Sequence, residues 1–240
     1  MTIDNEQMTI TSNNPDLQPQ YGKNYDAVLE YYFEPAGLLS LGVFQKNLSN
    51  FIYRSDAGTV GSDSIFGEAY AGYLLRTDFN GGSAEIRGLE VSYSQQFSNL
   101  PGFWRGFGAF ANFTWLESEG DYGEPGANIT GSELVGFTPR TGNVGISYMA
   151  HGVIVRVKMN YTGSRLSGFN ADPSRRTYDK ESLPVDLNLA YAVNRWLSVY
   201  ADVINVFNTP TNHQYRYVPS RMNRNDLYTT TIKFGVAGSF

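Results

Sequence analysis

Hydrophobic and polar residues alternate one by one along much of this chain. In residues 153–161, one side of an extended strand would carry Val153, Val155, Val157, Met159 and Tyr161, and the other side Arg156, Lys158 and Asn160. The same alternation runs through 107–115, 183–191 and 197–203. Successive side chains of a β-strand point to opposite faces, so this period of two predicts antiparallel strands with one apolar face and one polar face.

The sequence predicts nine such strands, each bounded by turn residues: 21–33, 38–53, 84–97, 106–117, 138–149, 153–163, 182–192, 196–207 and 227–240. Strands of soluble proteins are usually about 5–6 residues long. A tilted strand that crosses a bilayer needs about 9–11 residues, which every one of these segments reaches. Aromatic residues near the segment ends fit the interfacial girdle of a membrane barrel: Phe107, Trp115, Tyr161, Tyr191 and Trp196.

The connections between these segments alternate between short and long. The short ones are 34–37, 98–105, 150–152 and 193–195, and the long ones are 54–83, 118–137, 164–181 and 208–226. Outer-membrane barrels have short periplasmic turns and long outer loops, so the pattern favours a membrane barrel over a soluble sandwich. Residues 68–79, within the first long connection, are a further candidate strand.

Composition narrows the class of protein. Charged residues make up 17% of the 240 residues and aromatic residues 15%, whereas soluble domains have about 25% charged residues. No stretch approaches the roughly 20 apolar residues of a transmembrane helix. The net charge of −5 comes with no basic block, which argues against nucleic-acid binding.

The sequence offers few candidate residues for catalysis or metal binding. With no Cys and two His, His151 and His213, the chain offers neither a disulfide framework nor a multi-histidine or cysteine metal centre. No Ser, His and Asp arrangement has a hydrolase signature. The Asp residues precede no metal-loop pattern. The sequence therefore predicts no enzyme activity, no metal and no cofactor.

The last predicted strand ends on an aromatic residue. Counting back in twos from the end, one face holds Tyr228, Ile232, Phe234, Val236 and Phe240. This strand resembles the C-terminal strand of outer-membrane proteins, in which a terminal aromatic residue is part of the signal that the barrel-assembly machinery reads. The alternative is an ordinary last strand that happens to end in Phe.

Several motifs follow one another in the order of a known family. They are Asn14-Pro-Asp-Leu-Gln-Pro-Gln20, Leu29-Glu-Tyr-Tyr-Phe33, Gly42-Val-Phe-Gln-Lys46, Asn80-Gly-Gly-Ser-Ala-Glu-Ile-Arg-Gly-Leu-Glu-Val-Ser-Tyr93, Thr138-Pro-Arg140, Asp202-Val-Ile-Asn-Val-Phe-Asn208 and the terminal Phe240. Together they resemble the C-terminal half of the barrel of TonB-dependent outer-membrane receptors. The stretch 80–93 is the most specific of them.

The resemblance implies an all-β fold: a partial antiparallel transmembrane β-barrel in the bacterial outer membrane, surrounded by outer-membrane lipid. Residues 21–240 would be the C-terminal portion, about nine strands of a larger plugged barrel, and residues 1–20 an outer-loop remnant. Single-chain bacterial barrels have an even number of strands, so nine strands predict a fragment. The expected fragment lacks the family's plug and signal peptide.

The implied function is active import of a scarce, large nutrient. A siderophore, a carbohydrate or a similar molecule would be bound and imported with energy from a TonB-type energy-coupling protein, which acts through the missing N-terminal part. The sequence leaves the nutrient unidentified. Two alternatives stay open, namely a soluble Gly/Tyr-rich β-sandwich binding module and a passive porin-type barrel.

The long connections carry the candidate nutrient contacts. Arginine binds planar carboxylates and phosphates in a bidentate manner, and aromatic rings stack on sugar or catechol faces. The candidates in 164–181 and 208–226 are Arg175, Arg176, Tyr178, His213, Tyr215, Arg216, Tyr217 and Arg221. The alternative is a set of solvated loops that contact surface lipopolysaccharide or nothing.

A second group of polar residues is predicted to point into the barrel: Glu30, Glu90, Asn112, Arg156, Lys158, Asp186, Asn188, Asp202 and Lys233. They would contact the plug or the substrate, or simply make the wall polar because the lumen holds water.

Overall fold

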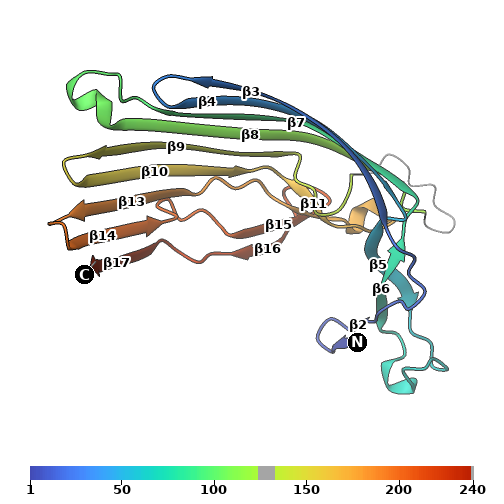
Figure 1. Ribbon diagram of the computed structural model, residues 1–240. Helices are drawn as coiled ribbons and strands as arrows, with labels where there is room; N and C mark the ends of the chain where they lie inside the picture. The colour runs from blue at the N-terminus through green and yellow to red at the C-terminus, as the bar shows by residue number, and fades with distance from the viewer. Residues whose placement is uncertain (124–132, 239–240) are drawn as a thin grey trace.

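A single antiparallel sheet of nine strands dominates the computed structural model, which describes residues 1–123 and 133–238. In chain order its strands are β3 (Tyr21–Phe33), β4 (Gly37–Ser49), β7 (Ser83–Gln96), β8 (Phe107–Gly120), β9 (Arg140–Ala150), β10 (Val153–Thr162), β13 (Val185–Ala192), β14 (Leu197–Ile204) and β17 (Thr231–Gly238). Each strand pairs with the next of these in the chain (Figure 1). All nine predicted segments are therefore confirmed as strands.

The strand register gives this sheet one apolar face and one polar face. Paired residues of antiparallel strands lie on the same face. One such row crosses six strands through Ala109, Ile146, Val157, Leu187, Val203 and Ile232. The opposite face carries the row Ser147, Arg156, Asn188, Asp202 and Lys233. We call these the apolar face and the polar face.

The polar residues predicted to point inward all lie on the polar face. A second row contains Glu30, Ser40, Ser92, Asn112, Asn143 and Asn160. Asn188 of the first row donates a hydrogen bond to Asp202, and Asn143 donates one to Asn112 at 2.9 Å. Alternation alone was enough to place these side chains.

The short connections gather at one end of the sheet and the long ones at the other (Figure 1). The turn between β9 and β10 shows why a short connection suffices. His151 and Gly152 have φ angles of 53° and 79°, and two successive positive φ angles match the twist of paired strands.

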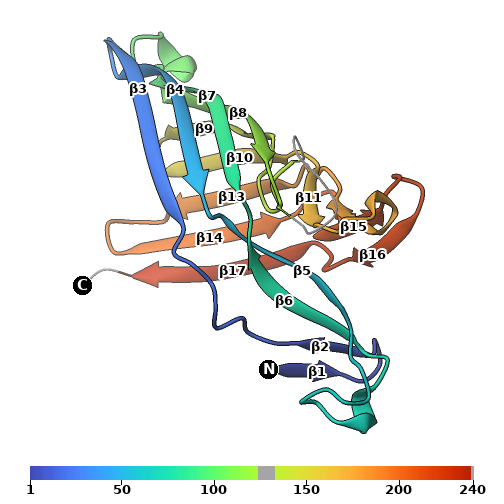
Figure 2. The same ribbon diagram turned by 90° about the vertical axis from the view of Figure 1, so that its right-hand side faces the viewer.

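The long connections contain further strands, so their treatment as plain loops was wrong. One four-stranded sheet has the order β1 (Thr2–Asp4), β2 (Thr9–Thr11), β6 (Leu74–Asn80), β5 (Ile52–Thr59). The other has the order β11 (Arg165–Gly168), β12 (Thr177–Asp179), β15 (Asn212–Arg216), β16 (Met222–Asp226). Strand β6 overlaps the candidate strand at 68–79. Figure 2 shows β5 and β6 leaving the main sheet as an arm, with β1 and β2 beside them.

The prediction of one strand over 38–53 was wrong at its C-terminal end. Strand β4 ends at Ser49, Asn50 has a φ of 54°, and β5 then enters the other sheet. Asparagine tolerates this left-handed conformation better than most residues. The alternation of Leu39, Leu41 and Val43 is interrupted by polar residues at 45, 47 and 49. The apolar residues that return at Phe51 and Tyr53 are both buried, and Tyr53 belongs to the second sheet.

Residues 1–20, expected as an outer-loop remnant, contain β1 and β2. Strand β2 pairs in parallel with β6, with Thr9 opposite Leu74. This segment therefore lies against the β5–β6 arm. The division of the chain at residue 20 stays a prediction.

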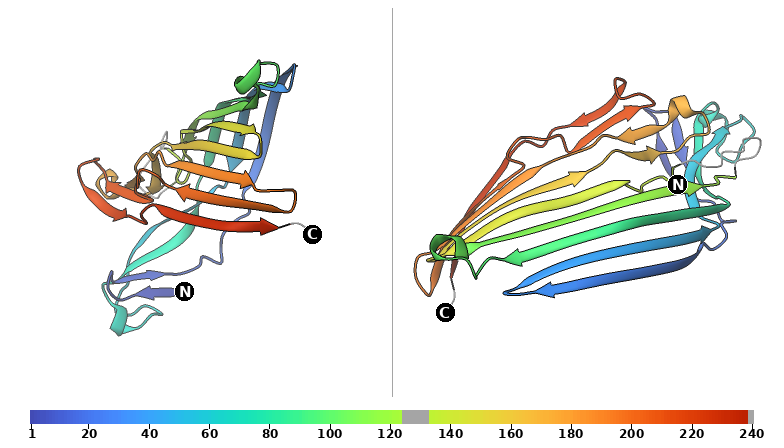
Figure 3. Two further views of the ribbon diagram at one scale, coloured as in Figure 1. Left: turned by 90° about the vertical axis from the view of Figure 1, so that its left-hand side faces the viewer. Right: turned by 90° about the horizontal axis from the view of Figure 1, so that it is seen from above.

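The main sheet is open. Strands β3 and β17 are its two edges, and within the described ranges neither has a second partner in that sheet. Figure 3 shows the long strands side by side in a curved layer that does not close. This is the partial barrel that the sequence predicts.

The described residues also include three short 3₁₀ helices: η1 (Glu68–Tyr70), η2 (Gly102–Gly106) and η3 (Pro173–Arg175). In the part of the chain that the structure describes, no helix is long and apolar enough to cross a membrane.

Candidate ligand-binding site

An aromatic cluster joins three of the long connections at their end of the sheet. The rings of Tyr122 and Phe169 stack with centroids 3.6 Å apart and an interplanar angle of 4°. The ring of Tyr53 stands at 88° to that of Tyr122, 4.8 Å away. Each residue comes from a different connection, so these contacts hold the connections against one another.

Tyr122 is the centre of this cluster, with 0% of its surface exposed. Its hydroxyl donates a hydrogen bond to the carbonyl oxygen of Glu133 at 2.8 Å and accepts one from the backbone N–H of Val135 at 3.1 Å. Its own carbonyl accepts a hydrogen bond from the hydroxyl of Tyr53 at 2.6 Å. Burial raises the pKa of Tyr122 from 10.0 to about 12.

We expect the cluster to lose stability in alkali. A folded-state pKa of about 12 lies above the ordinary value of 10.0, so the neutral phenol stabilises the folded cluster below pH 10 and this contribution is lost as the pH rises through 12. An ultraviolet titration of tyrosinate checks this, because the difference between the wild type and Tyr122→Phe should show one tyrosine that ionises near pH 12. A difference centred near pH 10 would contradict it.

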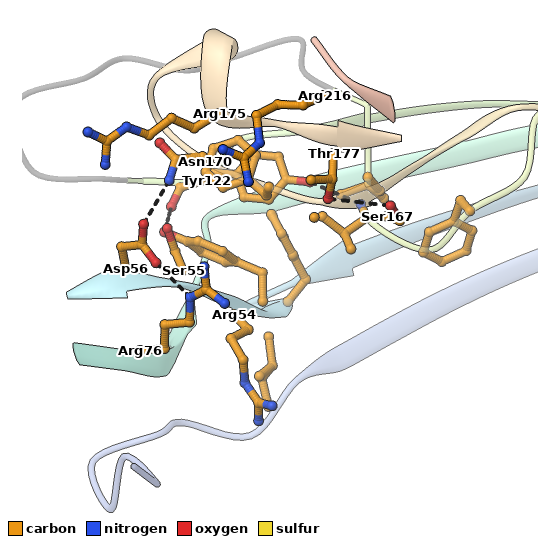
Figure 4. Close-up of a pocket in the computed structure, with 18 of the residues that line it drawn as sticks. Arg54, Ser55, Asp56, Arg76, Tyr122, Ser167, Asn170, Arg175, Thr177 and Arg216 are labelled. Atoms are coloured by element: carbon orange, nitrogen blue, oxygen red, sulfur yellow. Dashed lines mark hydrogen bonds and ion pairs between the residues drawn. The ribbon is translucent and has the colours of Figure 1, made fainter. Parts of the chain in front are cut away.

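A hollow of about 1030 Å³ adjoins this cluster. Its wall combines β5 and β6, the segment after β8, the β11–β12 connection and the β15–β16 hairpin. Figure 4 shows the polar part of the wall, with Arg54 and Arg76 on one side and Arg216 reaching in from the other. Polar and aromatic residues that line it include Arg54, Ser55, Asp56, Arg76, Tyr122, Phe169, Asn170, Arg175, Thr177, Gln214 and Arg216.

Two of the lining arginines are engaged in cross-strand ion pairs. Arg54 binds both carboxylate oxygens of Asp78, at 2.8 and 3.0 Å. Arg76 contacts Asp56 at 2.9 Å, and Asp56 also accepts a hydrogen bond from Asn170 at 2.9 Å. These contacts stiffen the arm and tie it to the β11–β12 connection.

The other two lining arginines keep donors for a ligand. Arg175 lies 3.7 Å from Asp172. The guanidinium of Arg216 donates a hydrogen bond to the neutral side chain of Asn223, at 3.4 Å, and forms no ion pair with any described residue. A guanidinium with free donors beside aromatic rings can bind a planar carboxylate, a phosphate or a catecholate.

The structure brings only some of the predicted contact residues to the hollow. Arg175 and Arg216 line it. Arg176 lies over the ring of Phe169 at 5.0 Å and donates a hydrogen bond to the carbonyl of Asn170 at 2.9 Å, so it supports the wall. The rings of Tyr178 and Tyr215 stack on each other at 5.3 Å.

The remaining candidates lie in the neighbouring strands and turn. The carbonyl of His213 accepts a hydrogen bond from Lys180, and Tyr217 has a φ of 66°. Neither of these two residues nor Arg221 lines the hollow. Ligand contact by any of the eight candidates stays a prediction.

The sequence did not predict that four further residues line the hollow, namely Arg54, Arg76, Tyr122 and Asn170. It does show Arg and Asp two positions apart in two segments, Arg54 and Asp56 in one and Arg76 and Asp78 in the other. This pattern indicates paired strands, but it does not tell which residues face a hollow.

The predicted barrel-assembly residues lie at the edge of the sheet. Ile232, Phe234 and Val236 are on the apolar face of β17, opposite Val203, Ala201 and Val199. Phe234 is 83% exposed. Tyr228 precedes β17, and Phe240 lies outside the described residues. Recognition by assembly machinery stays a prediction.

No group of three or more His, Asp or Glu side chains within residues 1–123 and 133–238 is arranged to hold a metal ion.

A two-faced open sheet with long connections at one end is the architecture of part of an outer-membrane barrel. The chain belongs to the family described as TonB dependent receptor-like, beta-barrel, which it matches over residues 4–206. This family consists of receptors of the bacterial outer membrane.

Solved structures share the fold at low sequence identity. The copper transporter OprC is 16% identical with a TM-score of 0.65, over 94% of this chain and 32% of that one. A variant of the ferric enterobactin receptor of Pseudomonas aeruginosa, in complex with enterobactin, is 18% identical with a TM-score of 0.63, over 96% and 33%. The ferric-catecholate import receptor Fiu of E. coli is 16% identical with a TM-score of 0.61, over 93% and 28%.

The chain thus spans about a third of the length of these proteins. No curated protein sequence matches it.

Proposed function

We propose that this chain is the C-terminal barrel part of an active transporter in the bacterial outer membrane. The whole protein binds a scarce, large nutrient and imports it with energy from a TonB-type coupling protein. The family supports this role. The neighbouring structures support it too, since their names include a copper transporter and ferric enterobactin receptors.

The observation that carries the proposal is the hollow at the end where the long connections converge. Arg175 and Arg216 line it and offer donors beside the Tyr122–Phe169 stack. In an outer-membrane barrel, long connections face the outside, where a nutrient arrives. An anionic nutrient with planar groups fits this wall better than a neutral sugar.

An uptake experiment tests the proposal. Bacterial cells that produce the protein as their only receptor are given labelled ferric enterobactin, a labelled copper salt or a labelled maltooligosaccharide, with and without functional TonB. We expect one of these probes to accumulate only when TonB is present. Accumulation that is equal without TonB would instead support the passive porin, and a chain that stays in aqueous solution without detergent would support the soluble β-sandwich.

Arg216→Gln is expected to weaken binding of the probe that accumulates by about tenfold to 100-fold, because it removes charge-assisted hydrogen bonds. Quenching of intrinsic fluorescence in detergent measures the affinity. Arg224→Gln is the matched control. Arg224 lies in the same hairpin, contacts Asp226 at 2.6 Å and does not line the hollow. An equal effect of both substitutions would place the ligand elsewhere.

A further inference from the structure

The connection between β7 and β8 differs from the other turns at the short-connection end. It runs through residues 97–106, contains helix η2, and exposes Phe103 and Trp104, each to 60% of its surface. The turns at 34–36 and 151–152 contain no helix. Two large aromatic side chains exposed side by side on one turn form an apolar patch, and such patches mark sites of contact with a membrane or another protein.

These two rings extend the apolar face beyond the ends of the strands. The ring of Phe103 lies 4.7 Å from that of Tyr148 and 5.2 Å from that of Phe107, and the ring of Trp104 lies 5.7 Å from that of Phe107. Phe107 and Tyr148 are paired across β8 and β9 on the apolar face. Whatever covers that face therefore continues over η2.

A positive charge stands beside the rings. Arg105 is exposed and forms no ion pair with the residues that the structure describes. Exposed tryptophan next to arginine suits the boundary between lipid headgroups and acyl chains, where the ring is half apolar and the guanidinium meets a phosphate. A second pair of the same kind lies in another turn of this end, with Arg195 4.5 Å from the ring of Trp196.

We propose that residues 97–106 are a lipid-binding foot of the barrel. Phe103 and Trp104 enter the headgroup boundary of the bilayer leaflet at the short-connection end, and Arg105 binds the phosphate of an anionic phospholipid. The foot fixes the depth of the sheet in the bilayer. It rests on the membrane location in the proposed function and is independent of the nutrient. Continuity with the apolar face favours lipid over a periplasmic protein as the occupant.

Tryptophan fluorescence tests the position of the foot. The chain has three Trp, so Trp115→Phe with Trp196→Phe leaves Trp104 as the sole reporter. The full chain is refolded into vesicles of phosphatidylcholine and phosphatidylglycerol, and the floating fraction is measured. We expect lipids brominated near the headgroup to quench Trp104 more than lipids brominated at the chain end, and aqueous iodide to quench it weakly. Full quenching by iodide with no effect of brominated lipid would overturn the proposal and leave a protein as the occupant.

A second reporter separates this proposal from the membrane location itself. Trp104→Phe with Trp196→Phe leaves Trp115, which is on the apolar face and 38% exposed. Quenching of Trp115 but not of Trp104 by brominated lipid would overturn the foot alone. A chain in which neither is quenched would overturn the foot and the membrane location together.

The proposed contact between Arg105 and a lipid phosphate is tested by a separate measurement. With Trp104 as reporter, we expect brominated phosphatidylglycerol to displace phosphatidylcholine with a preference of about fivefold, the effect of one arginine near an anionic surface. Arg105→Gln should remove this preference, and Arg224→Gln, at the other end of the molecule, should leave it unchanged. A preference that survives Arg105→Gln would overturn the role of Arg105.

Discussion

Tyr122→Ala is expected to destabilise the joined long connections by about 3–5 kcal/mol, the usual cost of truncating a buried aromatic residue. Tyr122 is fully buried, and its ring contacts those of Phe51, Tyr53 and Phe169. The substitution removes these ring contacts together with the hydrogen bonds to Glu133 and from Val135. Because these contacts link separate connections, the loss should open the connections and leave the sheet in place.

Trypsin cleavage under native conditions measures this opening. The β11–β12 connection contains Arg175 and Arg176, and when the connection opens and closes rapidly, the rate of cleavage follows the open population. A loss of 3 kcal/mol or more corresponds to an increase of about 100-fold or more.

Tyr122→Phe is the matched control. It keeps the ring and loses the hydroxyl, and should cost about 1–3 kcal/mol because the hydrogen-bonding groups of Glu133 and Val135 are left without that partner. Equal cleavage of wild type and Tyr122→Ala would show that the cluster does not hold the connections together.

Val91→Arg is expected to destabilise the membrane-inserted sheet by about 2–4 kcal/mol, the cost of an arginine on the lipid face near the bilayer midplane. Val91 lies on the apolar face between Leu41 and Phe113. Urea unfolding in phospholipid vesicles, extrapolated to zero denaturant, gives the free energy of unfolding.

Ser92→Arg is the control in the next position of the same strand. Ser92 lies on the polar face between Ser40 and Asn112, where an arginine can meet water. We expect a change below about 1 kcal/mol, as for a surface substitution. Equal losses for the two variants would mean that the apolar face is not in contact with lipid.

The nine main strands were predictable because the alternation that indicates a strand lies within that strand's own residues. A side chain points to one face or the other according to its place in the strand, so alternation along β10 placed Arg156 and Lys158 on the same face before any pairing was known. The strand order was also predictable, since short turns such as 151–152 can only join neighbours.

The candidate site was less predictable because its wall comes from distant parts of the chain. The sequence predicted Arg216 and Arg175 as cationic residues of the long connections. Three other residues line the hollow only because the β5–β6 arm and the segment after β8 meet the β11–β12 connection: Arg54, Arg76 and Tyr122. Arg176 has the same local sequence signal as Arg175, but it packs on the ring of Phe169 and does not line the hollow. Charge along the chain cannot distinguish these two roles.

By itself, the sequence determined the two-faced strands, their order, and the end at which the long connections gather, because period-two alternation and turn residues are local properties. Only the tertiary structure decided where β4 bends at Asn50, how the connections form two further sheets, and which arginines keep free donors. Those features depend on contacts between residues far apart in the chain, such as the stack of Tyr122 on Phe169. Such contacts leave no periodic pattern in the amino-acid sequence.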